Sequence, residues 1–275
     1  MNITNETGVM AQDPKKNKML IRILSALVML PAAIFIILQG GVLLFALVSI
    51  FTTIILYEWN GICEETAFSP LFLAQVISSL SVLFMIEISS PYLIYSFIIG
   101  IVLIVLISTL TKSTLKWSVL GYLYALVPSA SFLILHQHAG GLVVLWMMIV
   151  IWAMDTGAYF AGKNIGGPKM SPKISPNKTW AGLIGGTITA MVLGYMFVKY
   201  TGAQSALFDD VIVLVVLSGA FAILSQMGDL AESAIKRKFS VKDSGAIIPG
   251  HGGIMDRVDG LLFVAPSILI VTNFI

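Results

Sequence analysis

Residues 91–111 read PYLIYSFIIGIVLIVLISTLT, a run of 21 residues without one charged side chain. An α-helix of about 20 apolar residues is long enough to cross the hydrocarbon core of a bilayer. Over all 275 residues, 57% are hydrophobic and only 11% are charged, and the mean hydropathy is +0.95. A soluble domain carries about a quarter charged residues, so the composition predicts a protein that is embedded in a membrane.

Apolar stretches of similar length fill most of the chain and are separated by short polar connections. We expect spans at about residues 19–39, 40–58, 68–88, 91–111, 117–135, 141–161, 180–198, 210–228 and 254–274. The predicted fold class is therefore an all-α integral membrane protein with about nine transmembrane helices. We interpret residues 1–275 as a single polytopic membrane domain. Within it, 1–140 mainly embed the protein and 150–260 form the catalytic half.

The basic residues indicate the orientation. If the N-terminus is cytoplasmic and nine spans alternate, 15 of the 16 Lys and Arg residues lie on the cytoplasmic side. Cytoplasmic loops of membrane proteins carry an excess of these residues, so we expect the N-terminus inside and the C-terminus outside. The first span follows lysines as a signal peptide does, but its length predicts a retained helix. Glu58 and Glu64 then lie on the cytoplasmic side, where we interpret them as solvated charges.

The first polar cytoplasmic segment runs from Asp155 to Trp180. Asp155 lies near the end of an apolar helix, where an ionised carboxylate is costly. A functional role and a position that merely reaches the lipid headgroups are equally good interpretations of it. Gly162, Gly167 and Pro176 are expected to interrupt regular helix and leave N–H groups free to bind an anion. Four lysines surround this loop with positive charge, and two hydroxyl side chains add hydrogen-bond donors. The lysines are Lys163, Lys169, Lys173 and Lys178, and the hydroxyls belong to Ser175 and Thr179. Phosphate binding is favoured, and a basic loop that only fixes topology is the alternative.

The second segment runs from Asp229 to Asp259 and places carboxylates and cations at helical spacing. If span eight continues beyond the membrane, one face carries Asp229, Glu232, Ser233 and Lys236. Asp256 and Asp259 share a face at the next helix start. Mg²⁺ takes oxygen ligands from carboxylates and phosphates, while Lys and Arg neutralise remaining phosphate charge. The segment predicts a metal–polyphosphate site, with a network of salt bridges as the alternative.

The run from Ser233 to Asp259, SAIKRKFSVKDSGAIIPGHGGIMDRVD, resembles the signature of the phosphatidate cytidylyltransferases, also called CDP-diglyceride synthetases. The resemblance extends to Gly228-Asp229-Leu230-x-Glu232, Asp155-x-Gly157-Ala158-Tyr159, Gly162-Lys163 and Ser175-Pro176-x-Lys178-Thr179-Trp180. It covers residues 150–260, whereas the N-terminal half is similar only in being hydrophobic with short loops. One departure is Ala181, where the family usually carries Glu or Gln, and it removes one metal or nucleotide contact.

The resemblance implies transfer of CMP from CTP to phosphatidic acid, which gives CDP-diacylglycerol and pyrophosphate in phospholipid biosynthesis. It also implies Mg²⁺, as one ion or in a two-metal site, with Asp229, Asp256 and Asp259 as the first metal ligands. The other expected catalytic residues are Lys236, Arg237, Lys242, Asp243, His251 and Arg257. The expected substrate-binding residues are Asp155, Lys163, Ser175, Lys178, Thr179, Ser233, Gly252 and Gly253.

The expected partners are CTP, phosphatidic acid and the lipid bilayer, without nucleic acid, and a homodimer is left open. The expected location is the bacterial inner membrane, as a multi-pass protein. A CTP-dependent lipid-alcohol kinase is the alternative enzyme, and it would need a base for a hydroxyl nucleophile. A secondary transporter of an anionic solute is the alternative from another class. Transporters place polar residues near the midplane on broken helices of repeated halves, whereas these charges gather at one face.

Overall fold

The computed structural model describes residues 27, 29–64, 66–202, 210–245, 247 and 252–274. After a short apolar helix, Met29–Gln39, the long helices are α2 (Gly41–Cys63), α3 (Pro70–Glu87), α4 (Leu93–Thr111), α5 (Leu115–Ala139), α6 (Gly141–Asn164), α7 (Trp180–Thr201), α8 (Val211–Lys238) and α9 (Met255–Phe274). Strands β1 (Lys169–Ser171) and β2 (Ser175–Thr179) pair as an antiparallel hairpin between α6 and α7.

Among the described residues, seven helices (α2 to α8) are long and apolar enough to cross a membrane. A helix suits this environment because it satisfies its backbone hydrogen bonds internally, where no water can do so. α9 adds 20 residues, and Met29–Gln39 lies within the first expected span. The chain is an all-α multi-pass membrane protein, as the composition predicts.

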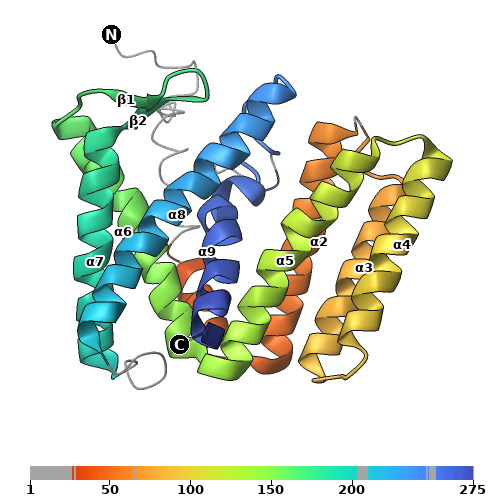
Figure 1. The fold of residues 1–275 in the computed structure, drawn as a ribbon, viewed down its shortest axis with the longest axis horizontal. Coiled ribbons are helices and arrows are strands. Elements are labelled where there is room, and N and C mark those ends of the chain that lie inside the picture. The colour runs from red at the N-terminus through yellow and green to blue at the C-terminus, as the bar shows by residue number, and fades with distance from the viewer. Residues whose placement is uncertain are drawn as a thin grey trace, which may run out of the picture.

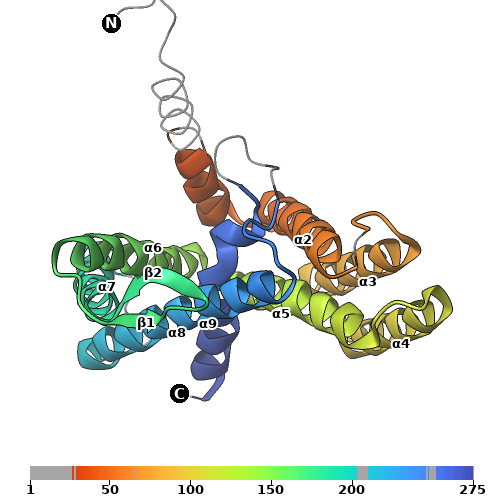
Figure 2. The same cartoon turned by 90° about the horizontal axis from the view of Figure 1, so that it is seen from above.

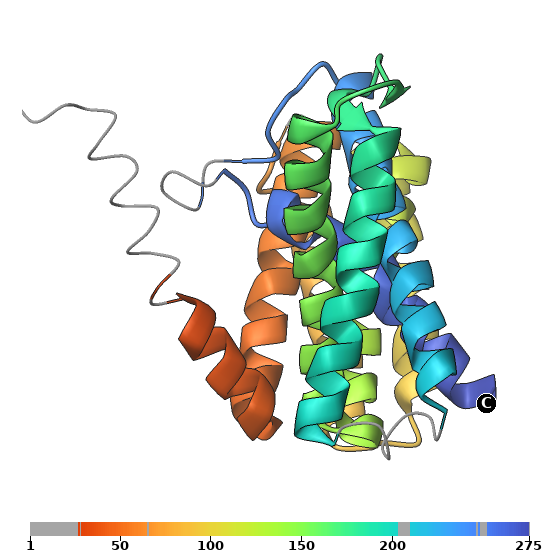
Figure 3. The same cartoon turned by 90° about the vertical axis from the view of Figure 1, so that its left-hand side faces the viewer.

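The helices form an elongated assembly with α9 near its centre (Figure 1). α6, α7 and α8 lie on one side of α9, α5 and α2 lie on the other, and α3 and α4 form the outer edge (Figures 1 and 2). Met29–Gln39 leans away from the remaining helices, and α9 runs obliquely through the assembly (Figure 3). The hairpin and the C-terminal end of α8 share one end of the molecule, whereas the α3–α4 and α5–α6 turns lie at the other. The two polar segments thus lie at one end, as alternating spans require, and which side of the membrane that end faces stays a prediction.

Five helices are longer than their expected spans: α2, α5, α6, α7 and α8. α2 continues past residue 58 to Cys63, and α8 continues to Lys238, as the second polar segment requires. α6 continues through Gly162, so the expectation that this glycine interrupts the helix is wrong. A Cβ at Gly162 would lie only 3.0 Å from the Thr179 hydroxyl. The residue therefore lets the start of α7 approach α6 closely, as small residues do between membrane helices.

Polar side chains join the N-terminal helices within their apolar surroundings. Thr52 of α2 donates to the Ser129 hydroxyl of α5 over 2.7 Å. Asn60 donates to Gln75 of α3 over 2.7 Å, and Gln75 donates to the Ser118 carbonyl of α5 over 2.8 Å. Such bonds contribute about 0.6 kcal/mol each on average between membrane helices. Together they fix the C-terminal half of α2, from which a carboxylate reaches α9.

Candidate functional site

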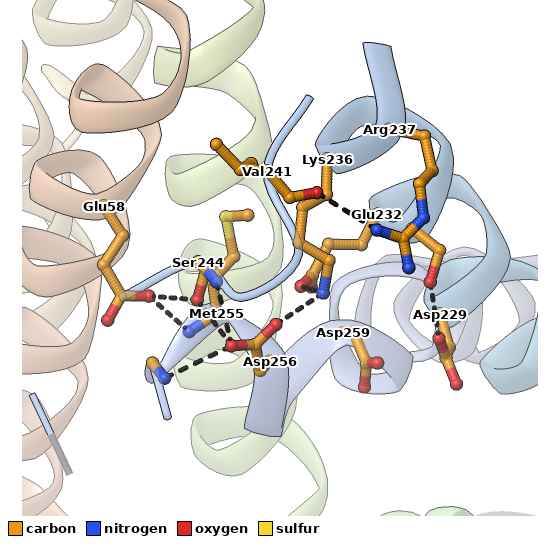
Figure 4. A network of polar contacts seen from close by, with 12 residues as sticks. Glu58, Asp229, Glu232, Lys236, Arg237, Val241, Ser244, Met255, Asp256 and Asp259 are labelled. Carbon is orange, nitrogen blue, oxygen red and sulfur yellow. Dashed lines mark hydrogen bonds and ion pairs between the residues drawn. The ribbon is translucent and has the colours of Figure 1, made fainter. Parts of the chain in front are cut away.

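Lys236 joins α8 to α9 (Figure 4). Its Nζ donates to Glu232 Oε1 over 2.9 Å and to Asp256 Oδ1 over 2.5 Å. The Glu232 side chain is fully buried and that of Lys236 is 12% exposed, so each charge needs a partner. Tyr124 of α5 donates to the second oxygen of Glu232 over 3.4 Å. The prediction that Glu232 and Lys236 share one face of a helix is confirmed. The bond from Lys236 to Asp256 extends this polar network to α9.

The β1–β2 hairpin covers the neighbouring part of α8. Lys178 of β2 forms an ion pair with Asp229, and Ser233 donates to Asp229 Oδ1 over 3.3 Å. One turn further along α8, Arg237 Nε donates to the Ile174 carbonyl over 3.3 Å. A lysine expected to bind substrate thus meets an aspartate expected to bind metal, although more than 50 residues separate them in sequence.

Three aspartates gather where α6, α8 and α9 meet. The carboxylate of Asp155 lies close enough to Asp229 to repel it, and Asp259 lies close to both. Figure 4 shows Asp229 and Asp259 side by side at the α8–α9 contact. The close approach needs Gly228, because a Cβ there would lie 2.5 Å from the Asp259 carbonyl oxygen. Because these three carboxylates repel one another, a cation bound between them would be electrostatically favourable.

A divalent metal ion is predicted at this point, and protein side chains alone would not complete its ligand set. No group of three His, Cys, Asp or Glu side chains within the described residues is arranged to hold a metal. Asp256 is engaged, because Oδ1 accepts from Lys236 and Oδ2 accepts from the Ser244 N–H over 3.0 Å. Asp229 is also engaged, by Lys178 and Ser233, so it would have to exchange Lys178 for the metal in order to join Asp259 as a hard oxygen donor. Mg²⁺ commonly takes one or two protein carboxylates plus phosphates and water. The metal-ligand assignment stays a prediction.

Glu58 is a member of this site that the sequence interpretation missed. Its side chain is only 2% exposed, so the expectation of a solvated charge is wrong. Oε1 accepts from the N–H of Ile254 over 2.9 Å, and Oε2 accepts from the N–H of Met255 over 2.9 Å. The signal was present in the sequence: Glu58 follows an apolar run directly, as Asp155 does.

The other expected site residues lie around this centre. Thr179 caps α7, since its hydroxyl accepts from the Gly182 N–H over 3.0 Å. Lys163 is exposed, and its Nζ lies 3.4 Å from the Tyr159 hydroxyl. Exposed side chains at the cytoplasmic segments also include Lys242, Asp243 and Arg257, while Ser175 lies in β2 and Gly252 has a φ of 84°. His251 lies outside the described residues. Their roles stay predictions.

An apolar cavity of about 280 Å³ lies beside the polar centre. α9 borders both, because Val258, Leu261 and Leu262 line the cavity, while Asp256 and Asp259 face α8. The remaining walls come from Met29–Gln39, α2, α5 and α6. Because the same helix borders a polar centre and an apolar cavity, the site suits an amphipathic ligand whose charged group binds at the centre and whose apolar part enters the cavity.

The Cytidylyltransferase family model matches residues 20–275. The chain belongs to this family. The phosphatidate cytidylyltransferase of Brucella suis biovar 1 is 37% identical over 213 residues, which are 76% of each chain. That of Rickettsia typhi is 35% identical over 194 residues, 70% of this chain and 85% of the relative. That of Bacillus subtilis is 47% identical over 123 residues, 45% of this chain and 44% of the relative. The resemblance inferred from the motifs is confirmed, and the chain is a nucleotidyltransferase.

Proposed function

We propose that this chain is a phosphatidate cytidylyltransferase at the cytoplasmic face of the bacterial inner membrane. A phosphate oxygen of phosphatidic acid attacks the α-phosphorus of CTP, the bond to the β-phosphate breaks, and pyrophosphate leaves with CDP-diacylglycerol as the other product. The carrying observation is that α9 presents Asp256 to Lys236 of α8 and Asp259 to Asp229 of α8, while its Val258 and Leu262 line an apolar cavity. Family membership and the bacterial relatives support the proposal, and a homodimer stays a prediction.

The residues suit this reaction because it needs charge neutralisation more than a base. A phosphomonoester has its second pKa near 6, so the attacking phosphate is mostly ionised at neutral pH. Lys178, Lys236 and Arg237 supply positive charge that would hold the phosphates of CTP and the lipid. Asp229 and Asp259 would hold Mg²⁺, which when bound neutralises phosphate charge and orients the reacting groups.

Purified protein in mixed micelles of detergent and phosphatidic acid is expected to convert CTP to pyrophosphate and a CDP-lipid. EDTA should stop both products, and added Mg²⁺ should restore them, because carboxylates and phosphates repel each other without the metal. Pyrophosphate release and lipid chromatography measure the two products together. Micelles with diacylglycerol in place of phosphatidic acid are the control. CDP and a phosphorylated lipid from that control would instead identify a lipid-alcohol kinase.

Filling the apolar cavity is expected to affect the lipid substrate alone. Leu262 lines the cavity and is 6% exposed. We expect Leu262→Trp to raise KM for phosphatidic acid about tenfold, because bulk placed in an apolar pocket displaces acyl groups, and to leave KM for CTP unchanged. Leu193→Trp is the matched control, since Leu193 is 42% exposed on α7. Equal KM values for the lipid in both variants would show that acyl chains bind elsewhere.

A further inference from the structure

Glu58 is a buried carboxylate that the proposed chemistry does not use. It lies near the end of α2, in the half of the chain expected mainly to embed the protein. An ionised group in such a place requires hydrogen bonds that replace water. Within the described residues, N–H and O–H donors from the segment that leads into α9 bind both of its oxygens.

Two of these donors belong to the start of α9. The helix begins at Met255, and Glu58 accepts from the N–H groups of Ile254 and Met255, each over 2.9 Å. The first N–H groups of a helix have no acceptor within the helix, and a negative charge at this end interacts favourably with the helix dipole. Glu58 therefore acts as a cap that one helix supplies to another, across almost 200 residues of sequence.

The third donor connects Glu58 to the polar centre. Ser244 Oγ lies 2.8 Å from Glu58 Oε2 and 3.0 Å from Asp256 Oδ2. The Ser244 N–H also donates to Asp256 Oδ2 over 3.0 Å, and the other oxygen of Asp256 accepts from Lys236. A continuous chain of hydrogen bonds thus runs from α2 through Ser244 and Asp256 to α8, as Figure 4 shows.

Two glycines make room for this carboxylate. A Cβ at Gly245 would lie 2.9 Å from Glu58 Oε1, and one at Gly253 would lie 2.5 Å from Oε2. Both distances are too short for a side chain to fit without displacing Glu58. The sequence predicts that Gly253 binds substrate. The structure shows a separate, steric reason for a glycine there, because any side chain would collide with Glu58.

We propose that Glu58 is a positioning residue for the cytidylyltransferase reaction. By capping α9 and holding Ser244, it fixes the first turn of that helix so that Asp256 and Asp259 face α8 in the orientation that the reaction needs. Glu58 acts through α9 and does not contact substrate. This inference rests on the proposed function, and its consequences can be measured separately from that function.

The test compares Glu58→Gln with Glu64→Gln. Glutamine keeps the shape of Glu58 but has one acceptor oxygen, so one N–H of the α9 start would face an NH₂ group. We expect Glu58→Gln to lower kcat about 10- to 100-fold, as is typical when an outer partner of a ligand is removed. KM for CTP should stay within about twofold. Amide hydrogen exchange, read by mass spectrometry on peptides that cover Ile254 and Met255, should become faster. Glu64→Gln should change neither quantity, because the Glu64 carboxylate accepts from Ser118 of α5 and lies away from the α9 start.

Ser244→Ala provides a second, milder variant, because it removes the hydroxyl link and leaves both backbone contacts of Glu58. We expect a smaller fall in kcat, and a double variant that falls less than the product of the two single effects, since both act through Asp256. Unchanged kcat and exchange in Glu58→Gln, or equal losses in Glu64→Gln, would overturn the proposal. If the unmodified protein turns over no CTP with phosphatidic acid, the assigned reaction fails. The exchange comparison then still decides whether Glu58 holds α9.

Discussion

Asp259→Asn is expected to lower kcat by about three orders of magnitude, because a carboxylate that holds Mg²⁺ contributes several kcal/mol of transition-state stabilisation. Asparagine keeps the size of the side chain and can still accept from the Gly260 N–H, which now donates to Asp259 Oδ1 over 2.7 Å. It also removes one of three mutually repelling carboxylates. The metal-free variant should therefore melt no lower than the unmodified protein, so that activity and stability change in different directions.

Mg²⁺ should raise the melting temperature of the unmodified protein and leave that of Asp259→Asn almost unchanged, because an ion stabilises only the state that binds it. Asp210→Asn is the matched control. Asp210 caps α8 at the opposite end of the helix, where Oδ1 accepts from the Ile212 N–H over 2.7 Å, and asparagine caps about as well as aspartate. Turnover of Asp259→Asn within about tenfold of normal would remove Asp259 from the proposed metal ligands.

Residue type and spacing were sufficient to predict the α8 part of the site. Glu232 and Lys236 are four residues apart, so a helix places them on one face whatever surrounds it. Likewise, the absence of charge from residues 91–111 makes a span the stable outcome in a bilayer. Both predictions depend on interactions that are local in sequence or on the solvent. The structure agrees with them for that reason.

Contacts between distant segments could not be predicted in this way. Glu58 was grouped with Glu64 because the two are close in sequence, yet one is buried against α9 and the other is at the end of α2. The difference depends on the packing of α2 against α9, which no local pattern encodes. Gly162 was misinterpreted for a related reason. A glycine that ends a helix and one that lets a neighbouring helix approach look alike until that neighbour is placed.

Asp256 shows that the expected role of a residue and its contacts in the folded chain can differ. The sequence places it beside Asp259 on one helical face, as a second metal ligand. In the structure, Lys236 and Ser244 bind its two oxygens, so ligation of a metal by Asp256 would require Lys236 to move. Lys236 is therefore the residue whose removal should affect both the fold and the reaction.

Lys236→Met is expected to lower the free energy of unfolding by about 3–5 kcal/mol, because it leaves Glu232 and Asp256 as buried carboxylates without their shared cation. The side chains of Lys236 and Asp256 are only 12% and 13% exposed, and that of Glu232 is fully buried. Solvent would therefore screen the two unpaired carboxylates only weakly. Thermal unfolding in detergent measures the effect. Lys238→Met is the matched control on the same helix turn, since Lys238 is exposed above the Trp117 ring and its loss should cost less than about 1 kcal/mol.

The double variant Glu232→Gln/Lys236→Met separates the two contributions of the lysine. Neutral glutamine removes one of the two buried charges that Lys236 compensates, the more buried one, so part of the lost stability should return. Turnover should not return, because the proposed contact of Lys236 with a substrate phosphate is still absent. KM for CTP and kcat, measured in the same mixed micelles, report on that contact. Recovery of both stability and turnover would mean that Lys236 serves the fold alone, and phosphate binding would then rest with Lys178 and Arg237.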